Sequence, residues 1–200
     1  MRAIAVREDV KDLVLDAADR LLARYGYKKM TVDDLAMEVG IGKGTIYLHF
    51  SSKEEIVLSH VDRTVARLLE RLEEIVRSND APSAQIKEML IARVMMRFDS
   101  VQHYTESLSD VLRSLRSPLL KRREGHFDAE AEIFARVLRE GERANVFGRQ
   151  EDRLETAHAL LLATNTLLPF SLSAQELGER DEVEKKASKI ADLLLEGLEK

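Results

Sequence analysis

The sequence predicts an all-α protein of about nine helices. Apolar residues recur at three- and four-residue steps along almost the whole chain, which is the spacing of one face of an α-helix. No stretch of useful length shows the alternation of apolar and polar residues that is typical of a strand. The 200 residues are 44% apolar and 34% charged. This is the composition of a globular protein, with enough chain for one large core or two small ones.

The first two helices are bounded by recognisable start and stop residues. The first carries an apolar stripe between Val10 and Tyr25 and is expected to end at Gly26, because glycine readily takes the left-handed conformation found after helix C-termini. Thr31 and Asp34 then form a capping-box-like pair, in which each side chain can bind the backbone N–H group of the other residue. This pair predicts the start of the second helix.

The third and fourth helices follow with little chain between them. The second helix is expected to end at Gly40, and the third to run over about residues 42–49. Ser51 or Ser52, each with a glutamate three residues later, can cap the fourth helix. The fourth helix has a long apolar stripe, which consists of Val61, Val65, Leu68, Leu69, Leu72, Ile75 and Val76.

Five further helices are expected in the rest of the chain. Pro82 and the pair Ser117-Pro118 mark two helix starts, because proline suits the first position of a helix. The segment from Asn145 to Gly148 marks a helix end. Together with the apolar stripes, these signals predict helices over about residues 82–101, 108–115, 118–144, 151–172 and 182–198.

Residues 31–50 carry the pattern of a helix-turn-helix. Two short helices joined by a tight turn at Gly40 allow the first to cross a phosphate backbone and the second to enter the major groove of DNA. The formal net charge of −5 argues against a polyanionic partner, but residues 39–53 contain two lysines, one histidine and no acid. Residues 1–60 hold nine basic and ten acidic residues, so we expect DNA contact from one oriented surface.

The same segment resembles a known family. The run Gly-x-x-Lys-Gly-Thr-x-Tyr-x-x-Phe-x-x-Lys-Glu, from Gly40 to Glu54, strongly resembles the N-terminal signature of the tetracycline-repressor (TetR) family of bacterial transcription regulators. The resemblance implies a helix-turn-helix DNA-binding domain over residues 1–50 and a helical effector-binding and dimerisation domain over residues 51–200. The DNA contacts that it implies are Thr31, Gly42, Lys43, Gly44, Thr45, Tyr47, His49 and Lys53. Gly42 stands where the family commonly has serine, so we expect no side-chain cap there.

The resemblance also implies a homodimer that responds to a small molecule. The helix of each protomer that enters the major groove is called its reading helix. The two reading helices must lie about 34–36 Å apart, or a multiple of that, to reach the two half-sites of a pseudo-palindromic operator on successive turns of the DNA. In the family the last two long helices pair between protomers, and the matching dimer residues are Leu154, His158, Leu161, Leu162, Ala187, Ile190, Leu194 and Leu198. The effector pocket of the family lies among the middle helices, where the candidates are Met89, Met95, Met96, Phe98, His103, Tyr104, Phe127, Phe134 and Asn165. Adjacent methionines suit a compliant apolar cavity, so we expect a small hydrophobic or amphipathic effector.

These features predict a ligand-responsive regulator, a repressor that binds a pseudo-palindromic operator in double-stranded DNA and is released by its effector. The alternative is a helical protein that binds or carries a small molecule and does not bind DNA. Such a protein would not need the segment without acidic residues at 39–53. We expect no enzymatic activity, metal or other cofactor, because the sequence shows no nucleophile and base pair and no metal-ligand constellation. With no signal peptide and no apolar run long enough to span a bilayer, we expect a cytoplasmic protein without a membrane partner.

Overall fold

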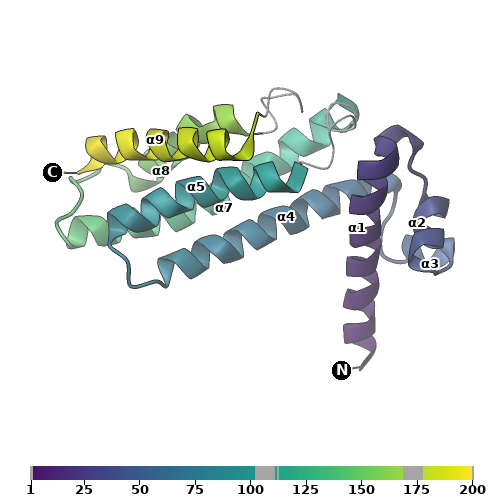
Figure 1. Cartoon of the computed structure of the whole chain (residues 1–200). Helices are drawn as coiled ribbons and strands as arrows, with labels where there is room; N and C mark the ends of the chain where they lie inside the picture. Colours follow the sequence, from purple (N-terminus) through teal and green to yellow (C-terminus); the bar gives the residue numbers. More distant parts are fainter. Residues whose placement is uncertain (1, 102–110, 112, 169–177, 200) are drawn as a thin grey trace. The chain divides into compact units, whose positions relative to one another are not determined.

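The protein is all-helical, as the sequence predicts. The computed structural model describes residues 2–101, 111, 113–168 and 178–199 (Figure 1). In this part of the chain the helices are α1 (Arg2–Lys29), α2 (Val32–Val39), α3 (Lys43–Tyr47), α4 (Lys53–Val76), α5 (Pro82–Val101), α7 (Arg116–Arg143), α8 (Arg153–Thr164), the short 3-10 helix η1 (Asn165–Leu167) and α9 (Arg180–Leu198). Among these residues the one extended pairing is an isolated bridge between Phe147 and Glu199. None of the described helices is both long and apolar enough to cross a membrane.

The chain forms two compact units. The first consists of Met1–Thr64 with His103–Leu119, and the second of Val65–Gln102 with Leu120–Lys200. Each unit combines two segments that are separated in the sequence, so neither unit is one continuous stretch of chain. The domain boundary expected at residue 50 stays a prediction.

The first unit is organised around α1. Its buried face consists of Val14, Leu15, Ala17, Ala18, Leu21 and Leu22, which confirms most of the predicted stripe, although Leu13 and Tyr25 are exposed. Gly26 has φ 73° and ψ 168°, so the regular part of the helix stops at the predicted residue and one further turn follows it. Arg63 of α4 donates to the carboxylates of Asp12 and Asp16 on α1 at 3.1 and 2.7 Å. These ion pairs hold the first turns of α4 against α1.

The second unit is a bundle with one continuous core. Helix α5 packs along α9 and also contacts α8 (Figure 1). The core takes its buried residues from five helices, and they include Leu72 of α4, Met89 of α5, Phe134 of α7, Leu161 of α8 and Leu195 of α9. On α9 the buried positions are Val183, Ala187, Ala191, Leu195 and Leu198. This spacing of three and four residues is that of an amphipathic helix with one buried face.

The boundaries of α7 and α8 differ from the prediction in an informative way. Helix α7 begins at Arg116, slightly before the predicted cap at Ser117, so Pro118 lies inside the first turn, where its missing N–H group has no intrahelical acceptor. The continuous helix expected over residues 151–172 is wrong, because α8 ends at Thr164 and Leu168 is extended, with φ −91° and ψ 149°. The next residue is Pro169, which disfavours helical backbone in the residue before it. The helix predicted over residues 108–115 falls mostly outside the described residues.

The end of α7 contains a close approach between a helical glycine and a core ring. Phe147 is fully buried, and a Cβ atom placed on Gly141 would lie 2.1 Å from its Cδ2 atom. In a helix interior alanine is normally about 1 kcal/mol better than glycine. Here the ring occupies the space that the methyl group needs, so the glycine is required by packing.

We expect Gly141→Ala to lower the free energy of unfolding by roughly 1–3 kcal/mol, the usual cost of overpacking a core. Gly125→Ala in the same helix is the matched control, because nothing lies within 4 Å of its Cβ position. We expect that control to gain about 0.5–1 kcal/mol from helix propensity. Urea unfolding of both variants measures the difference, and equal stabilisation by both would contradict the close packing of Phe147.

Candidate nucleic-acid interface

Helix α2 is started by a reciprocal pair of hydrogen bonds. The backbone N–H of Asp34 donates to the Thr31 hydroxyl at 3.1 Å, and the backbone N–H of Thr31 donates to the Asp34 carboxylate at 2.9 Å. The hydrogen bond from the Thr31 side chain holds the pKa of Asp34 below its usual value. The predicted capping box is therefore confirmed, with aspartate in the place that glutamate usually takes. The Thr31 hydroxyl is already used within the protein.

A left-handed glycine joins α2 to α3. Gly40 has φ 75° and ψ 30°, and its N–H group donates to the carbonyl groups of Ala36 and Met37. Helix α3 begins after Gly42, which offers no side-chain hydrogen bond to the free N–H groups, as its departure from the family pattern predicts. Ile46 is fully buried and anchors the helix. The short helix is thus held by its connections and by one apolar side chain.

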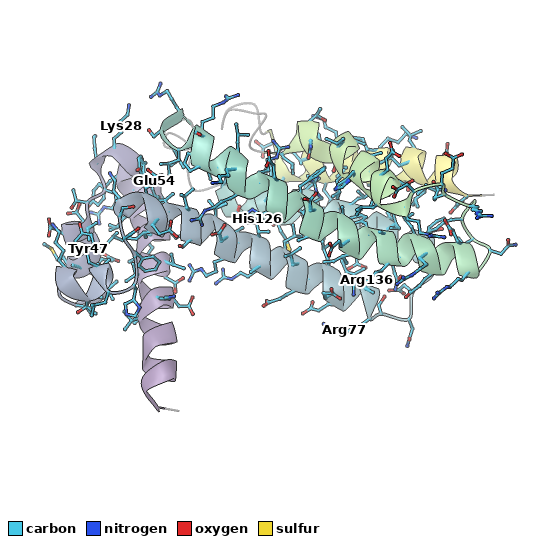
Figure 2. All side chains as sticks on the ribbon, turned by 180° about the vertical axis from the view of Figure 1, so that it is seen from behind. Lys28, Tyr47, Glu54, Arg77, His126 and Arg136 are labelled. Atoms are coloured by element: carbon cyan, nitrogen blue, oxygen red, sulfur yellow. The ribbon has the colours of Figure 1, made fainter. Side chains whose placement is uncertain are left out.

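The opposite side of α3 faces outward. Lys43, Gly44 and Tyr47 are exposed on it, whereas Thr45 and His49 are partly buried. Tyr47 lies at the surface of this segment (Figure 2). Leu48, directly after α3, is 81% exposed and was not among the predicted contacts. The sequence contains a signal for this exposure. Ile46 and Phe50 are four residues apart and both buried, and Leu48 lies between them, off the helix face that they share.

The Lys43 ammonium group is engaged by an acid from α2. Its Nζ lies 2.8 Å from Oδ2 of Asp33, and both side chains are largely exposed. The hydrogen bond to Asp33 raises the pKa of Lys43 above its usual value. An exposed ion pair of this kind contributes little to stability and is easily exchanged. Lys43 can therefore leave Asp33 for a phosphate or a base edge. Asp33 is an anionic competitor for Lys43, and no local pattern in the sequence indicates this contact.

Lys53 has a structural role within the first unit. Its ammonium group donates to the carbonyl oxygens of Tyr27 at 2.9 Å and Met30 at 3.1 Å, and it lies 4.3 Å from the centre of the Tyr27 ring. Burial lowers the pKa of Lys53. These contacts tie the start of α4 to the residues that join α1 and α2. They leave one N–H of the ammonium group for the predicted DNA contact.

Comparison with known proteins places this segment in a family. Residues 14–59 match the sequence profile of "Bacterial regulatory proteins, tetR family". The fatty acid metabolism regulator protein of Bacillus subtilis (strain 168) is 33% identical over 85 residues, which are 42% of each chain. The HTH-type transcriptional regulator EthR of Mycolicibacterium smegmatis is 38% identical over 60 residues, or 30% of this chain and 28% of EthR. The matched region spans less than half the length of these curated relatives.

Residues 14–59 thus form a DNA-binding segment of the TetR type. Solved structures extend the likeness in fold to almost the whole chain. A transcriptional regulator from Cytophaga hutchinsonii has a TM-score of 0.77 at 23% identity, with 94% of this chain and 98% of that one covered. The regulator FadR from Bacillus subtilis, in complex with stearoyl-CoA, has a TM-score of 0.69 at 18% identity, with 93% and 98% covered. The second unit therefore shares the helical fold of these solved regulators.

The predicted effector residues separate into three groups. Met89, Met95, Phe98 and Phe134 are buried. Met96, Phe127 and Asn165 are partly buried. His103 and Tyr104 lie outside the described residues. The assignment of this set to an effector pocket stays a prediction.

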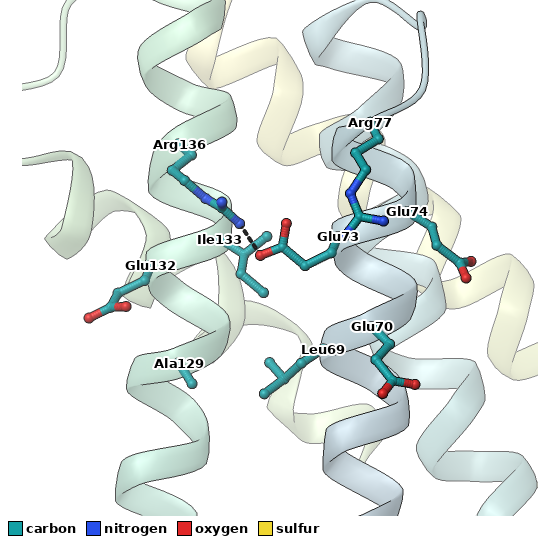
Figure 3. A pocket seen from close by; sticks show the side chains of 9 residues that line it. All are labelled: Leu69, Glu70, Glu73, Glu74, Arg77, Ala129, Glu132, Ile133 and Arg136. Atoms are coloured by element: carbon teal, nitrogen blue, oxygen red, sulfur yellow. Dashed lines mark hydrogen bonds and ion pairs between the residues drawn. The ribbon is translucent and has the colours of Figure 1, made fainter.

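A groove in the second unit has a different lining. It is about 760 Å³ and runs between α4 and α7, where Arg136 meets the carboxylate of Glu73 (Figure 3). Its other charged residues are Glu70, Glu74, Arg77 and Glu132. No predicted effector residue lines this groove, and its charged walls do not suit an apolar ligand.

The predicted dimer residues lie on two different faces. Leu154 and Leu162 are 41% and 58% exposed on the outer side of α8, and His158 lies partly exposed between them. Ile190 and Leu194 of α9 are partly buried. Leu161, Ala187 and Leu198 are buried in the core of their own unit. These last three side chains cannot form a surface for a partner, whereas Leu193, not among the predicted residues, is exposed.

Proposed function

We infer that this chain is a ligand-responsive transcription regulator, a repressor without catalytic activity that binds double-stranded DNA. The outward face of α3 carries the inference. Buried Ile46 anchors the short helix from inside, and Lys43, Gly44 and Tyr47 are presented to solvent. This is the arrangement that a helix needs to enter the major groove while the preceding helix crosses the backbone.

A homodimer supplies the second reading helix. One helix of this length contacts too few bases and phosphates for specific affinity, whereas two helices read two half-sites. The exposed leucines of α8, Leu154 and Leu162, offer an apolar stripe for the partner. A large exposed apolar patch rimmed by polar residues is typical of an interaction surface.

The effector is a small hydrophobic or amphipathic molecule. Two matches support this class, since a curated relative is named a fatty acid metabolism regulator and a similar solved structure is in complex with stearoyl-CoA. Such a ligand releases DNA only if it binds more tightly to a form whose reading helices are wrongly spaced, and the coupling is reciprocal. Operator DNA must therefore weaken effector binding by the same factor.

Lys43→Ala tests the DNA-binding face. We expect an operator selected from random DNA to bind the variant roughly 10- to 100-fold more weakly if Lys43 contacts a base edge. If Lys43 contacts phosphate, the loss should be similar for all sequences, and the slope of log affinity against log salt should fall by about one. Fluorescence anisotropy over a salt series measures both quantities.

Lys29→Ala is the matched control, because Lys29 is an exposed lysine of the same unit at the end of α1. We expect this variant to bind the operator as the wild type does. An unchanged affinity of the Lys43 variant would remove Lys43 from the interface. If the wild-type protein enriches no sequence when it is used to select from random DNA, sequence-specific DNA binding is contradicted.

A further inference from the structure

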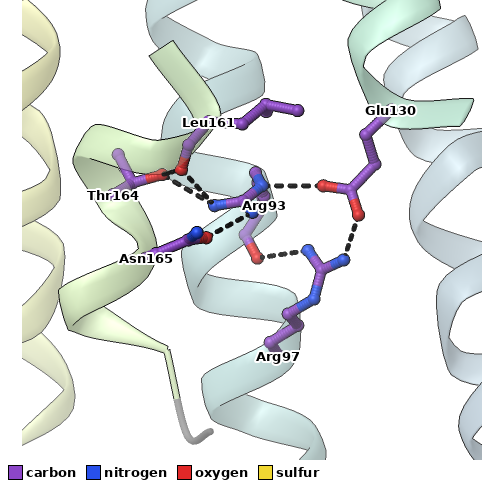
Figure 4. Close-up of polar contacts among 6 residues, drawn as sticks. All are labelled: Arg93, Arg97, Glu130, Leu161, Thr164 and Asn165. Atoms are coloured by element: carbon purple, nitrogen blue, oxygen red, sulfur yellow. Dashed lines mark hydrogen bonds and ion pairs between the residues drawn. The ribbon is translucent and has the colours of Figure 1, made fainter. Parts of the chain in front are cut away.

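A buried cluster in the second unit contains two arginines and one carboxylate. Nε of Arg93 lies 2.7 Å from Oε2 of Glu130, and Nη2 of Arg97 bonds the other oxygen of the same carboxylate (Figure 4). The side chains of Arg93 and Glu130 are 2% and 1% exposed, and that of Arg97 is 10% exposed. The two cations come from α5 and the anion from α7. One positive charge of this cluster has no counter-charge within it.

The charge excess is costly in the free protein. A buried ion is tolerated when it is paired and hydrogen-bonded, because water no longer solvates it. Burial lowers the pKa of Arg93 to about 10, and the attraction of Glu130 opposes this shift, while Arg97 and Arg123 add to it. The protonated guanidinium is thus less stable here than in water, although it persists at neutral pH. An additional anion would remove this penalty.

Arg97 is the residue of this cluster that has unused N–H donors. Arg93 donates to the Leu161 carbonyl at 3.1 Å, the Thr164 hydroxyl at 2.7 Å and the Asn165 amide oxygen at 2.8 Å. Arg97 has one other acceptor besides Glu130, the backbone carbonyl of Arg93 at 3.3 Å. Since an arginine carries five N–H donors, Arg97 retains unused ones toward all described residues. A carboxylate or phosphate fits that planar pattern of donors.

One aromatic ring lies beside the cationic cluster. The Phe127 ring lies 5.9 Å from the guanidinium carbon of Arg93 and stacks on His158 at 5.2 Å between ring centres. Met96 and Phe127 are partly buried and pack against the apolar core of the unit. A ligand that reaches the cluster therefore meets cationic groups with an aromatic ring beside them.

We propose that Arg97, supported by Arg93, binds the anionic head group of an amphipathic effector, a carboxylate or phosphate on an apolar chain. The proposal rests on the proposed function, whose effector it specifies further. It also connects the effector to the dimer helix, because Arg93 binds the last turn of α8 through Leu161 and Thr164. An anion that draws the arginines toward itself changes the contacts that end α8.

The test compares probes that share one chain and differ in the head group. Dodecanoate, dodecyl phosphate, dodecanol and dodecyltrimethylammonium are titrated into the full-length protein by calorimetry. We expect the two anionic probes to bind the wild type at least about tenfold more tightly than dodecanol, because charge-assisted hydrogen bonds are the strong ones. The cationic probe should bind most weakly. A difference between the two anions identifies the preferred head group.

Arg97→Gln should lose the preference for anions while its affinity for dodecanol stays within about twofold of the wild type. Arg97→Lys keeps a point charge without the planar fork, so it should retain part of the preference. Arg139→Gln removes an exposed arginine from α7 and is the matched control, with unchanged binding of all probes. Circular dichroism confirms that each variant is folded, and Arg97→Lys decides the question if Arg97→Gln unfolds.

Three results would overturn the proposal: equal binding of anionic and neutral probes, an intact preference in the Arg97 variants, or no binding of any probe. Operator binding without probe is measured on the same proteins. Loss of the anion preference with operator binding intact in Arg97→Gln supports the head-group site. A wild type that enriches no DNA sequence contradicts the regulatory function, and the probe titrations still decide the anion site.

Discussion

Replacement of both Leu154 and Leu162 by glutamate should reduce operator affinity at least about a hundredfold and convert the protein to monomers. Both leucines are exposed on α8, at 41% and 58%, outside the set of residues that α8 buries. Charges on this stripe would have to be desolvated in a dimer, and like charges on the two protomers would repel each other. A monomer holds one reading helix and loses the second half-site.

The oligomeric state of this double variant is measured by light scattering, and operator binding by anisotropy. Leu120→Glu is the matched control, because Leu120 is an equally exposed leucine on α7. We expect the control to remain dimeric with wild-type affinity. A dimeric double variant would place the protomer interface elsewhere, and a monomeric variant with full affinity would contradict the need for two half-sites.

Glu130→Ala should lower the free energy of unfolding by about 3–5 kcal/mol, the usual cost of removing one partner from a buried ion pair. The variant leaves the guanidinium groups of Arg93 and Arg97 together in the core without the carboxylate that both of them bind. Two like charges then face each other in a region of low dielectric constant. The loss arises from the unpaired cations and exceeds the net contribution of the ion pairs themselves.

Glu132→Ala is the matched control for this variant, because Glu132 is an exposed glutamate on the same helix. We expect its urea midpoint to lie close to that of the wild type, since exposed substitutions usually change stability by less than about 0.5 kcal/mol. Similar midpoints for the Glu130 and Glu132 variants would show that the buried cluster has another source of compensation.

The N-terminal unit could be predicted in detail because its signals are local. The capping pair of Thr31 and Asp34, the stop at Gly26 and the turn at Gly40 each depend on backbone conformation within a few residues. The sequence also indicates which part of the chain is free of acids. It does not show that Asp33 reaches back to Lys43, ten residues later, because that contact depends on how α2 and α3 pack.

In the second unit the sequence predicts the helices but does not decide which face of each one is buried. Periodicity places Leu154, Leu161 and Leu162 on one apolar helix, but it does not say which apolar side meets the core. The structure buries Leu161 and exposes the other two. Likewise, the helix expected to continue to residue 172 ends early, because the backbone before Pro169 is extended and Arg93 binds the last turn of α8.

Spacing and one contiguous motif are sufficient to predict the all-helical fold, the helix-turn-helix and the resemblance of residues 14–59 to the TetR family. Which side chains share a buried charge depends on tertiary packing. Arg93 and Glu130 are separated by 37 residues, and Arg93 and Asn165 by 72. In the sequence each of these arginines resembles an ordinary solvated residue. They are buried because of the way in which α5, α7 and α8 pack together. No local sequence pattern indicates which charges that packing brings into contact.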